Sequence, residues 1–316
     1  MKLGHFDLNL LVALDALLDT RSVTRASERL HIGASATSSA LGRLREYFGD
    51  DLLTQVGRRM ELTPLGKALA KPVKEILLSV QSTVIARPDF DPADAKRDFT
   101  IRASDYLTTV LLVSVVQRLQ REAPGIKLHI ANMTDDVNQQ LDRGEIDFVI
   151  YPSAGVSQRH ASSVLFEDTY SCVVWADSDA VGAKLDVDLY QRLGHVAATF
   201  GDSRRMSFET LAIAEMGLQR SIEVTTNNFN TLPQLVVGTS RVATIHTRLA
   251  EIYAKYLPLR IFPVPFPLPP LIEVLQWHEI NDNDPAHRWL RDLIKEQAAV
   301  QGASVRKRSP IDKIKT

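Results

Sequence analysis

Hydroxyl side chains and arginines gather between residues 35 and 59. Ser38 and Ser39 follow Ser35 by three and four residues, so a helix would carry all three on one face. Small hydroxyls let a helix approach phosphates and base edges closely, and guanidinium groups form charge-assisted hydrogen bonds with phosphates. This chemistry favours a contact with DNA. The predicted DNA-contacting residues are Ser35, Thr37, Ser38, Ser39, Arg43, Arg58 and Arg59.

A second polar set lies further along the chain. Ser104 and Asp105 follow a strand predicted over residues 99–103 and open a helix predicted over residues 107–122. The free N–H groups at a helix start suit a polar or anionic ligand. A helix N-cap is the alternative interpretation of Ser104, and it is the commoner role for a serine at such a position. Thr169 lies where the chain is predicted to cross between two lobes.

The apolar spacing over residues 7–62 predicts the elements that would hold the first set. The first helix is expected to be deeply buried, with a main face of Leu8, Leu11, Val12, Asp15 and Leu18 that is broadened by Leu10, Leu14 and Leu17. Helices are also predicted over 23–30 and 35–47, joined by a tight turn at 31–33, and a β-hairpin is predicted over 52–62. Two helices joined in this way form a helix-turn-helix, whose second helix enters the major groove of DNA.

A long helix is predicted from Thr63 to about Ile85, with Thr63 as its N-cap and Pro64 in its first turn. Pro72 lies inside this helix and predicts a kink. A narrow apolar seam, which suits pairing with another helix, is formed by Leu65, Leu69, Val73, Ile76, Val80 and Val84. Residues 87–92 contain two prolines and predict a domain boundary.

After Arg97, strands and helices alternate, which predicts a largely parallel sheet covered by helices. A second α/β unit is expected over residues 169–265, with the chain crossing between the lobes near 165–169 and 263–271. The closing elements are a strand at 271–277 and a helix at 285–299. Clefts between lobes and at the carboxyl ends of parallel strands are where ligands bind.

The charge balance limits how the chain could bind nucleic acid. Its 316 residues include 37 basic and 38 acidic side chains, and this net charge of −1 excludes a bulk polycation. Residues 1–63 contain eight basic and eight acidic side chains, and residues 64–87 add three net positive charges. Each subunit would therefore make few phosphate contacts, so we expect affinity to come from two copies that bind together.

Other motifs narrow the function further. The single cysteine, Cys172, excludes an intramolecular disulfide and a cysteine-rich zinc site. Asp7 and Asp15 interrupt the N-terminal apolar run, so no signal peptide or membrane span is predicted, and a cytoplasmic location is expected. Catalytic and cofactor motifs such as GxSxG, GxGxxG and HExxH are absent. An α/β enzyme or a small-molecule-binding protein without a DNA role is the alternative.

Four stretches together resemble the LysR-type transcriptional regulators across nearly the whole chain: FDLNLLVALDALL, SVTRASERLHIGASATSSALGRLREYFGDDLL, ELTPLGKALA and LDRGEIDFVI. The opening and the LAKPV segment are most similar to the branch of nodulation regulators and of salicylate- or nitroaromatic-responsive regulators. The resemblance implies an N-terminal, all-α winged helix-turn-helix with a long dimerising linker helix. It also implies an α/β two-lobed effector module like a periplasmic binding protein, and assembly as a dimer of dimers.

The resemblance also implies a function and further site residues. It suggests an activator whose DNA bending and recruitment of RNA polymerase respond to a small aromatic, phenolic or carboxylated effector, with no other cofactor. Further pocket positions are implied at Asp202, Ser203, Arg204, Asn228, Arg248 and Gln276. A solvated helix residue is the alternative interpretation of Arg248, and a turn is that of Asn228. Gly33-Ala34-Ser35 replaces the family's usual Ser-Gln-Pro, so operator specificity does not follow from the resemblance.

The expected domains are as follows. Residues 1–62 form the DNA-binding domain, 63–92 the linker helix and hinge, and 93–303 the effector module, followed by a basic tail at 304–316 that is expected to be disordered. Within the module, lobe I comprises 93–168 and 270–303, and lobe II comprises 169–269.

Overall fold

The computed structural model describes residues 7–57, 59–85, 90–200 and 205–306. The chain divides into two compact units, Met1–Arg87 and Pro88–Thr316, which are taken separately below. No helix in the described part of the chain is long and apolar enough to cross a membrane.

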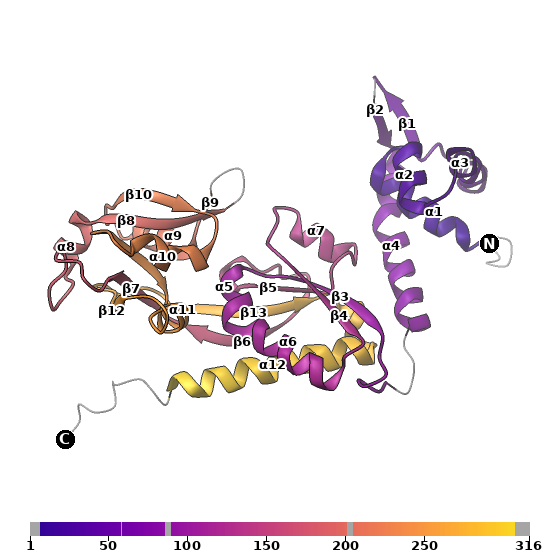
Figure 1. Ribbon diagram of the computed structural model, residues 1–316. Helices are drawn as coiled ribbons and strands as arrows, with labels where there is room; N and C mark the ends of the chain where they lie inside the picture. Colours follow the sequence, from indigo (N-terminus) through magenta and orange to yellow (C-terminus); the bar gives the residue numbers. More distant parts are fainter. Residues whose placement is uncertain (1–6, 58, 86–89, 201–204, 307–316) are drawn as a thin grey trace. The chain divides into compact units, whose positions relative to one another are not determined.

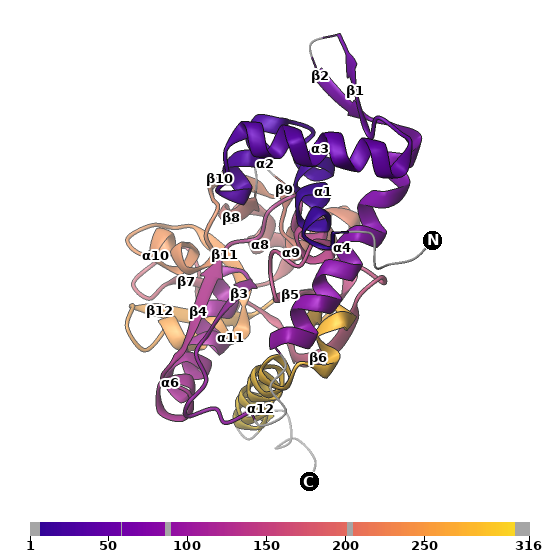
Figure 2. The ribbon, with the colours of Figure 1, turned by 90° about the vertical axis from the view of Figure 1, so that its right-hand side faces the viewer.

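The first unit is a small helical bundle with a projecting β-hairpin (Figure 1). Its elements are α1 (Asn9–Thr20), α2 (Val23–Leu30), α3 (Ala34–Phe48), β1 (Leu53–Val56), β2 (Arg59–Leu62) and α4 (Pro64–Ile85). Local chemistry sets the helix ends: Ser22 caps α2 by accepting a hydrogen bond from the Arg25 N–H, and Gly49 ends α3 with a φ of 62°. Figure 2 shows the antiparallel β1–β2 hairpin projecting beyond α3.

The buried face of α1 differs from the predicted one. Leu10, Leu14 and Leu17 lie in the core of the unit, whereas Leu8 and Val12 are 57% and 46% exposed. The prediction that Leu8 and Val12 belong to the main buried face is therefore wrong. Apolar residues surround most of α1, so periodicity could not tell which side meets α2, α3 and α4.

The long helix α4 begins as predicted, because the Thr63 hydroxyl accepts a hydrogen bond of 3.0 Å from the Gly66 N–H. It continues through Pro72. The apolar seam has a buried part and an exposed part. Val73 is buried in the unit's core, whereas Ile76 and Val80 are about half exposed.

The second unit contains two lobes, each built on one sheet (Figure 1). In lobe I the strand order is β4-β3-β5-β13-β6, where β3 is parallel to β4 and β5, and β13 is antiparallel to β5 and β6. The strands are β3 (Arg97–Arg102), β4 (Ile126–Ala131), β5 (Phe148–Pro152), β6 (Ala161–Asp168) and β13 (Leu271–Trp277). The helices are α5 (Asp105–Leu107), α6 (Val113–Glu122), α7 (Val137–Asp142) and α12 (Pro285–Arg306), with short helical segments η2 (Thr108–Leu112), η3 (Ser153–Gly155) and η5 (Glu279–Asn283).

Lobe II has the strand order β10-β8-β11-β7-β12, with the short β9 beside β8. Its elements are β7 (Tyr170–Trp175), α8 (Val187–Arg192), β8 (Gly194–Phe200), β9 (Arg205–Met206), α9 (Phe208–Glu215), β10 (Ser221–Thr226), η4 (Phe229–Thr231), α10 (Leu232–Val236), β11 (Val242–His246), α11 (Thr247–Tyr253) and β12 (Leu259–Pro263). The chain passes between the lobes at Thr169 and again over residues 264–270, where crossings were predicted.

Two predicted helices have different bounds. The helix predicted over residues 107–122 starts at Asp105 and contains one π-helical turn over Thr108–Leu112. The closing helix extends to Arg306, three residues into the predicted tail, and residues 307–316 lie outside the described part. Asp284 caps this helix, because its Oδ1 accepts hydrogen bonds from the Ala286 and His287 N–H groups.

Candidate functional site

The exposed face of α3 carries the predicted serines. Ser35, Ser38 and Ser39 are all exposed, and a Cβ at Gly42 would meet nothing within 4 Å. This open surface suits close approach to another molecule. Arg43 extends the face and is exposed, and its guanidinium binds the Asp7 carboxylate at 3.0 Å. The Asp7 pKa is lowered mainly by a backbone hydrogen bond from Asn9 and further by Arg43.

Thr37 does not belong to that face. Its side chain is fully buried, and its hydroxyl donates a hydrogen bond to the Gly33 carbonyl oxygen at 3.3 Å. Positions 37, 41 and 44 are four and three residues apart, so Thr37 shares the inward side of α3 with Leu41 and Leu44. The prediction of Thr37 as a DNA contact is therefore corrected to a core residue.

The hairpin places one of its two predicted arginines. Arg59 begins β2 and is exposed, and Arg58 lies outside the described residues. Gly57 makes the turn with a φ of 62°, a conformation that glycine adopts without strain. Arg45 of α3 holds the start of the hairpin, because its guanidinium donates to the carbonyl oxygens of Asp51 and Leu53 at 2.9 and 2.8 Å.

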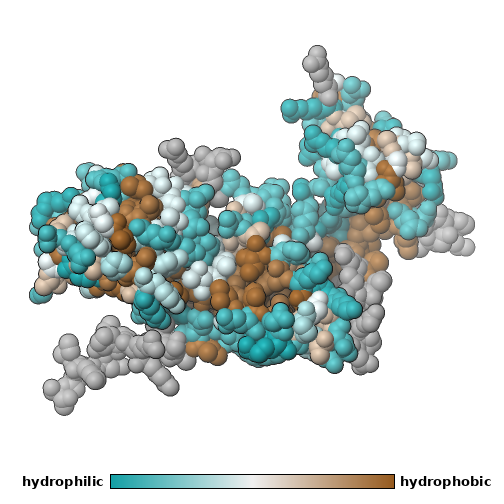
Figure 3. Space-filling model, in the orientation of Figure 1, coloured by the Kyte–Doolittle hydropathy of each residue, from teal (hydrophilic) through white to brown (hydrophobic). Residues whose placement is uncertain are grey.

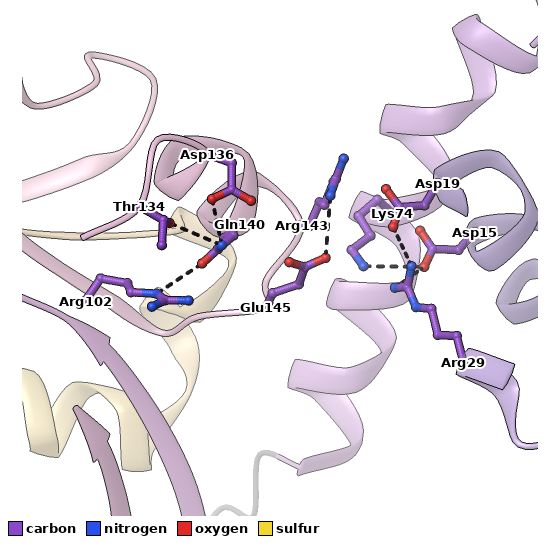
Figure 4. A network of polar contacts seen from close by, with 10 residues as sticks. All are labelled: Asp15, Asp19, Arg29, Lys74, Arg102, Thr134, Asp136, Gln140, Arg143 and Glu145. Carbon is purple, nitrogen blue, oxygen red and sulfur yellow. Dashed lines mark hydrogen bonds and ion pairs between the residues drawn. The ribbon is translucent and has the colours of Figure 1, made fainter. Parts of the chain in front are cut away.

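A charged network, which the sequence analysis did not identify, holds three helices of the first unit together (Figure 4). The Asp15 carboxylate on α1 accepts from Arg29 of α2 at 3.2 Å and from Lys74 of α4 at 3.4 Å. Arg29 also binds Asp19 at 2.7 Å. The contacts join α2, which supports α3, to the long helix α4.

In the second unit, Ser104 is a helix N-cap. Its Oγ accepts a hydrogen bond from the Leu107 N–H at 3.3 Å, and its carbonyl oxygen accepts from the Thr108 hydroxyl at 3.1 Å. The structure therefore gives Ser104 the alternative role. Asp105 binds lobe II directly, since both of its carboxylate oxygens accept from backbone N–H groups of Phe229 and Asn230.

Hydroxyl groups meet at the first crossing between the lobes. The Thr247 hydroxyl lies 2.9 Å from that of Thr169 and 2.8 Å from that of Ser171. Thr169 is exposed, and Thr247 is half-buried at the start of α11. Three hydroxyls at this spacing can donate to and accept from a polar ligand group.

Other implied pocket residues have internal partners. Arg248 is buried, donates to the Glu167 carbonyl oxygen at 3.0 Å, and lies over the Phe166 ring at 4.3 Å, so the solvated alternative is wrong. Asn228 caps η4 by accepting from the Thr231 N–H and hydroxyl. Gln276 is almost fully buried, and its amide bonds to both backbone polar groups of Ser157.

Gln276 is therefore corrected from an effector contact to a residue that holds the loop after β5. Asn228 has the turn-forming role given as its alternative interpretation, since its side-chain oxygen is used by its own segment. The implied positions Asp202, Ser203 and Arg204 lie outside the described residues.

An aromatic cluster at the lobe junction was missed by the sequence analysis. His246 lies at its centre, with ring centroids 3.9 Å from Tyr106, 4.8 Å from Phe229 and 5.4 Å from Tyr170. Burial lowers the pKa of His246 to about 3, so the imidazole is neutral at physiological pH. Phe200 extends the cluster, with its ring 4.9 Å from Phe229. These residues come from both lobes and lie far apart in the chain, so no local sequence pattern predicts that they form a cluster.

Two buried carboxyls lie beside this cluster. Burial, together with the smaller effect of the nearby Asp168, raises the pKa of Glu273 to about 8. Burial also raises the pKa of Asp168, although the Tyr106 hydroxyl donates to its Oδ2 at 2.6 Å and opposes the shift. The one available signal was a glutamate inside the apolar strand Leu271–Trp277, where an unpaired charge would be costly.

A polar set in lobe I holds α7 against the end of β3 (Figure 4). Arg102 donates to the Gln140 side-chain oxygen at 3.1 Å, and the Gln140 amide donates to Asp136 at 2.9 Å. Among the described residues, no group of three histidine, cysteine, aspartate or glutamate side chains could hold a metal ion.

Both units match known families over most of their length. Residues 8–67 match the bacterial regulatory helix-turn-helix protein, lysR family, and residues 93–299 match the LysR substrate binding domain. The chain belongs to the LysR family of transcriptional regulators. This confirms the predicted family, and with it the helix-turn-helix domain followed by a two-lobed effector module. Transcription regulation, DNA binding and effector binding are the properties of this family.

Similar proteins agree with this assignment. Nodulation protein D 1 of Rhizobium tropici is 42% identical to the regulator over 299 residues, which cover 95% of this chain and 97% of the relative. A solved structure of a probable transcriptional regulator from Pseudomonas aeruginosa has a TM-score of 0.62 at 30% identity and covers 93% of this chain and 98% of that one. Full-length OxyR from Pseudomonas aeruginosa shares the fold, with a TM-score of 0.67 at 18% identity over 94% of this chain and 95% of that one.

Proposed function

We propose that the regulator activates transcription in response to a small aromatic, phenolic or carboxylated effector bound at the lobe junction. The observation that carries this proposal is that half-exposed aromatic rings lie at the same crossing as a set of hydroxyls that hydrogen-bond to one another. Tyr170 and Phe229 offer ring faces or edges, and Thr169 and Thr247 offer hydroxyls. An aromatic compound with one polar substituent would match both, because apolar contact supplies affinity and the hydroxyls fix its orientation.

The DNA contact is proposed for the exposed face of α3 and for the hairpin. Ser35, Ser38 and Ser39 would face the major groove, Arg43 would lie at its edge, and Arg59 would reach a backbone phosphate. Because this face carries few charges, we propose that affinity comes from several subunits that bind one promoter.

We propose a homotetramer, a dimer of dimers, in which effector binding changes DNA bending and the recruitment of RNA polymerase. Exposed apolar side chains support self-association: Ile76 and Val80 on α4 in the first unit, and Val113 and Val116 on α6 in the second. Figure 3 shows the apolar residues over α5 and α6. An effector that favours one lobe arrangement shifts the population of the whole assembly, and linkage carries that shift to the DNA-binding domains. The proposed domain limits are those predicted above, with the effector module extended to Arg306, where its closing helix ends.

Effector binding can be tested by calorimetry on the full-length regulator with a panel of benzoates, phenols and non-aromatic carboxylic acids. We expect an aromatic compound to bind, and Thr247→Val to weaken its binding roughly tenfold, the loss typical of one hydrogen bond. Thr225→Val is the matched control, because it makes the same change at an exposed threonine on β10. Binding by a compound that is neither aromatic nor carboxylated, with no binding by any member of the panel, would contradict the proposed effector class.

DNA binding can be tested by footprinting upstream of the regulator's own gene. Circular-permutation gels then compare the DNA bend angle with and without the effector. We expect a protected site and two different angles. Equal angles would refute the bending mechanism, and an absence of any protected site there or at neighbouring promoters would favour a small-molecule-binding role without DNA.

A further inference from the structure

Asp105 joins the two lobes through its carboxylate. It lies at the start of α5 in lobe I, at the end of the lobe that adjoins lobe II (Figure 1). Its Oδ1 accepts a hydrogen bond of 3.1 Å from the Phe229 N–H, and its Oδ2 accepts one of 2.7 Å from the Asn230 N–H. Two carboxylate oxygens thus engage two consecutive backbone donors, a fork that fixes orientation as well as distance.

The side chain of Asn230 completes the contact from lobe II. Its Nδ2 donates to the Asp105 carbonyl oxygen at 3.1 Å, and its Oδ1 accepts from the Thr109 hydroxyl at 3.0 Å. Both amide atoms of Asn230 are therefore used across the junction. Together with the carboxylate fork, four hydrogen bonds join one turn of lobe I to the start of η4.

The neighbouring residue Tyr106 connects this contact to the chain crossing. Its ring stacks on His246 of lobe II, and its hydroxyl donates to Asp168, the last residue of β6 before the crossing at Thr169. A second contact between the lobes lies at the end of β5, where the Tyr151 ring meets Phe208 edge-on at 5.7 Å.

We propose that Asp105, Thr109 and Asn230 form an interlobe latch that sets the arrangement of the lobes. Without the latch, the lobes would be joined by the two crossings, by aromatic contacts, and by the bonds of Arg248 to Glu167 and Asp168, which lie within two residues of the first crossing. Aromatic contacts tolerate sliding better than directed hydrogen bonds, and contacts beside a crossing allow rotation about it. The latch explains why Asp105 is unsuited to hold an effector, since both its oxygens already have backbone partners. It also does not cap its own helix, because Ser104 has that role.

The latch requires only the two lobes, so its test is independent of the effector and of DNA. Spin labels would be attached to Lys127→Cys on β4 of lobe I and Tyr256→Cys after α11 of lobe II, both at exposed positions. The native Cys172 is fully buried and stays unlabelled in the folded chain. The labelled full-length protein is mixed with excess unlabelled protein, so that pulsed electron spin resonance measures distances within one chain.

We expect Asp105→Ala to broaden or shift the distance distribution between the labels. Asp136→Ala is the matched control, because Asp136 is a carboxylate at a helix start of lobe I whose bonds stay within that lobe. We expect it to leave the distribution unchanged. An unchanged distribution in Asp105→Ala would overturn the proposal.

Two further variants test the interlobe latch even if Asp105→Ala fails to fold. Asn230→Ala and Thr109→Val remove the side-chain bonds and leave the carboxylate fork in place. We expect Asn230→Ala to broaden the distribution, and Thr109→Val to add little once Asn230 is already alanine, since they share one hydrogen bond. Unchanged distributions in both single variants, or full additivity of their effects on the melting temperature, would count against the latch.

Discussion

Lys74 of the long helix α4 donates a hydrogen bond of 3.4 Å to Asp15 of α1, and Asp15 also accepts from Arg29 of α2. Asp15 and Lys74 are largely shielded from solvent, with side-chain exposures of 13% and 16%. The carboxylate therefore fixes the long helix against the helix-turn-helix. A change in the direction of α4 would move α2 through these contacts, and α2 would in turn move α3.

We expect Asp15→Ala to lower the free energy of unfolding by about 1–2 kcal/mol, because it leaves two cations without their shared partner. Urea denaturation measures the change. Glu75→Ala is the control: Glu75 pairs with Lys71 within α4 in an exposed ion pair, whose loss should cost less than about 0.5 kcal/mol. Equal effects of the two variants would contradict the coupling role of Asp15.

Arg59→Ala should weaken DNA binding to all sequences alike and reduce the salt dependence. Loss of one phosphate contact in each subunit reduces the magnitude of the slope of log affinity against log salt by about 0.9 for every subunit bound to the DNA. Fluorescence anisotropy at several salt concentrations measures this slope. An unchanged slope would show that the hairpin does not touch the backbone.

Thr37→Ala separates stability from DNA contact on α3. Because Thr37 is buried and Ser38 is exposed, Thr37→Ala should destabilise the fold by about 1 kcal/mol, whereas Ser38→Ala should leave stability unchanged and weaken DNA binding. Thermal melts and anisotropy on both variants distinguish these effects. The reverse pattern would restore Thr37 to the DNA-contacting face.

Glu273 predicts that stability falls as the pH rises from 4.5 to 8. Its pKa in the folded chain is raised to about 8 from an ordinary value of 4.5. The folded state then binds more protons than the unfolded state between pH 4.5 and 8, so stability falls as the pH rises through that window. Glu273→Gln should flatten this fall, as measured by urea denaturation from pH 5 to pH 9.

The opposite dependence should persist in Glu273→Gln at acid pH. Burial lowers the pKa values of His246 and His287 to about 3, so the unfolded state binds more protons below pH 6.5. Stability is therefore lost as the pH falls from 6.5 toward 3. A flat profile for the unsubstituted protein between pH 6.5 and 8, above the range in which these histidines contribute, would contradict the raised pKa of Glu273.

Cys172 should be unreactive in the folded protein. It is fully buried, and burial raises the pKa of its thiol to about 12, so almost no thiolate is present at neutral pH. We expect a thiol reagent to modify it only after addition of denaturant, at a rate that follows unfolding. Rapid modification of the native protein would contradict this burial and would require another labelling strategy for the latch experiment.

The predictions from sequence are most accurate where a local pattern decides the structure. The N-cap at Thr63, the strand at residues 126–131 and the exposed serines of α3 all follow from propensity and spacing over one or two turns. The predictions are less accurate where several faces of one helix could be the buried one. The buried side of α1 depended on which neighbours pack against it, and Thr37 was assigned to the wrong side of α3 for the same reason.

The sequence by itself determined the order of the elements, the two crossings between the lobes and the family. These depend on hydrophobic periodicity, turn residues and motifs that lie close together in the chain. Only the tertiary structure decided what Asp105, Gln276 and His246 do. Asp105 meets Phe229 across 124 positions of the chain, and Gln276 meets Ser157 across 119. Hydrogen bonds and ring contacts at such separations depend on how complete sheets pack, and no short stretch of residues encodes that packing.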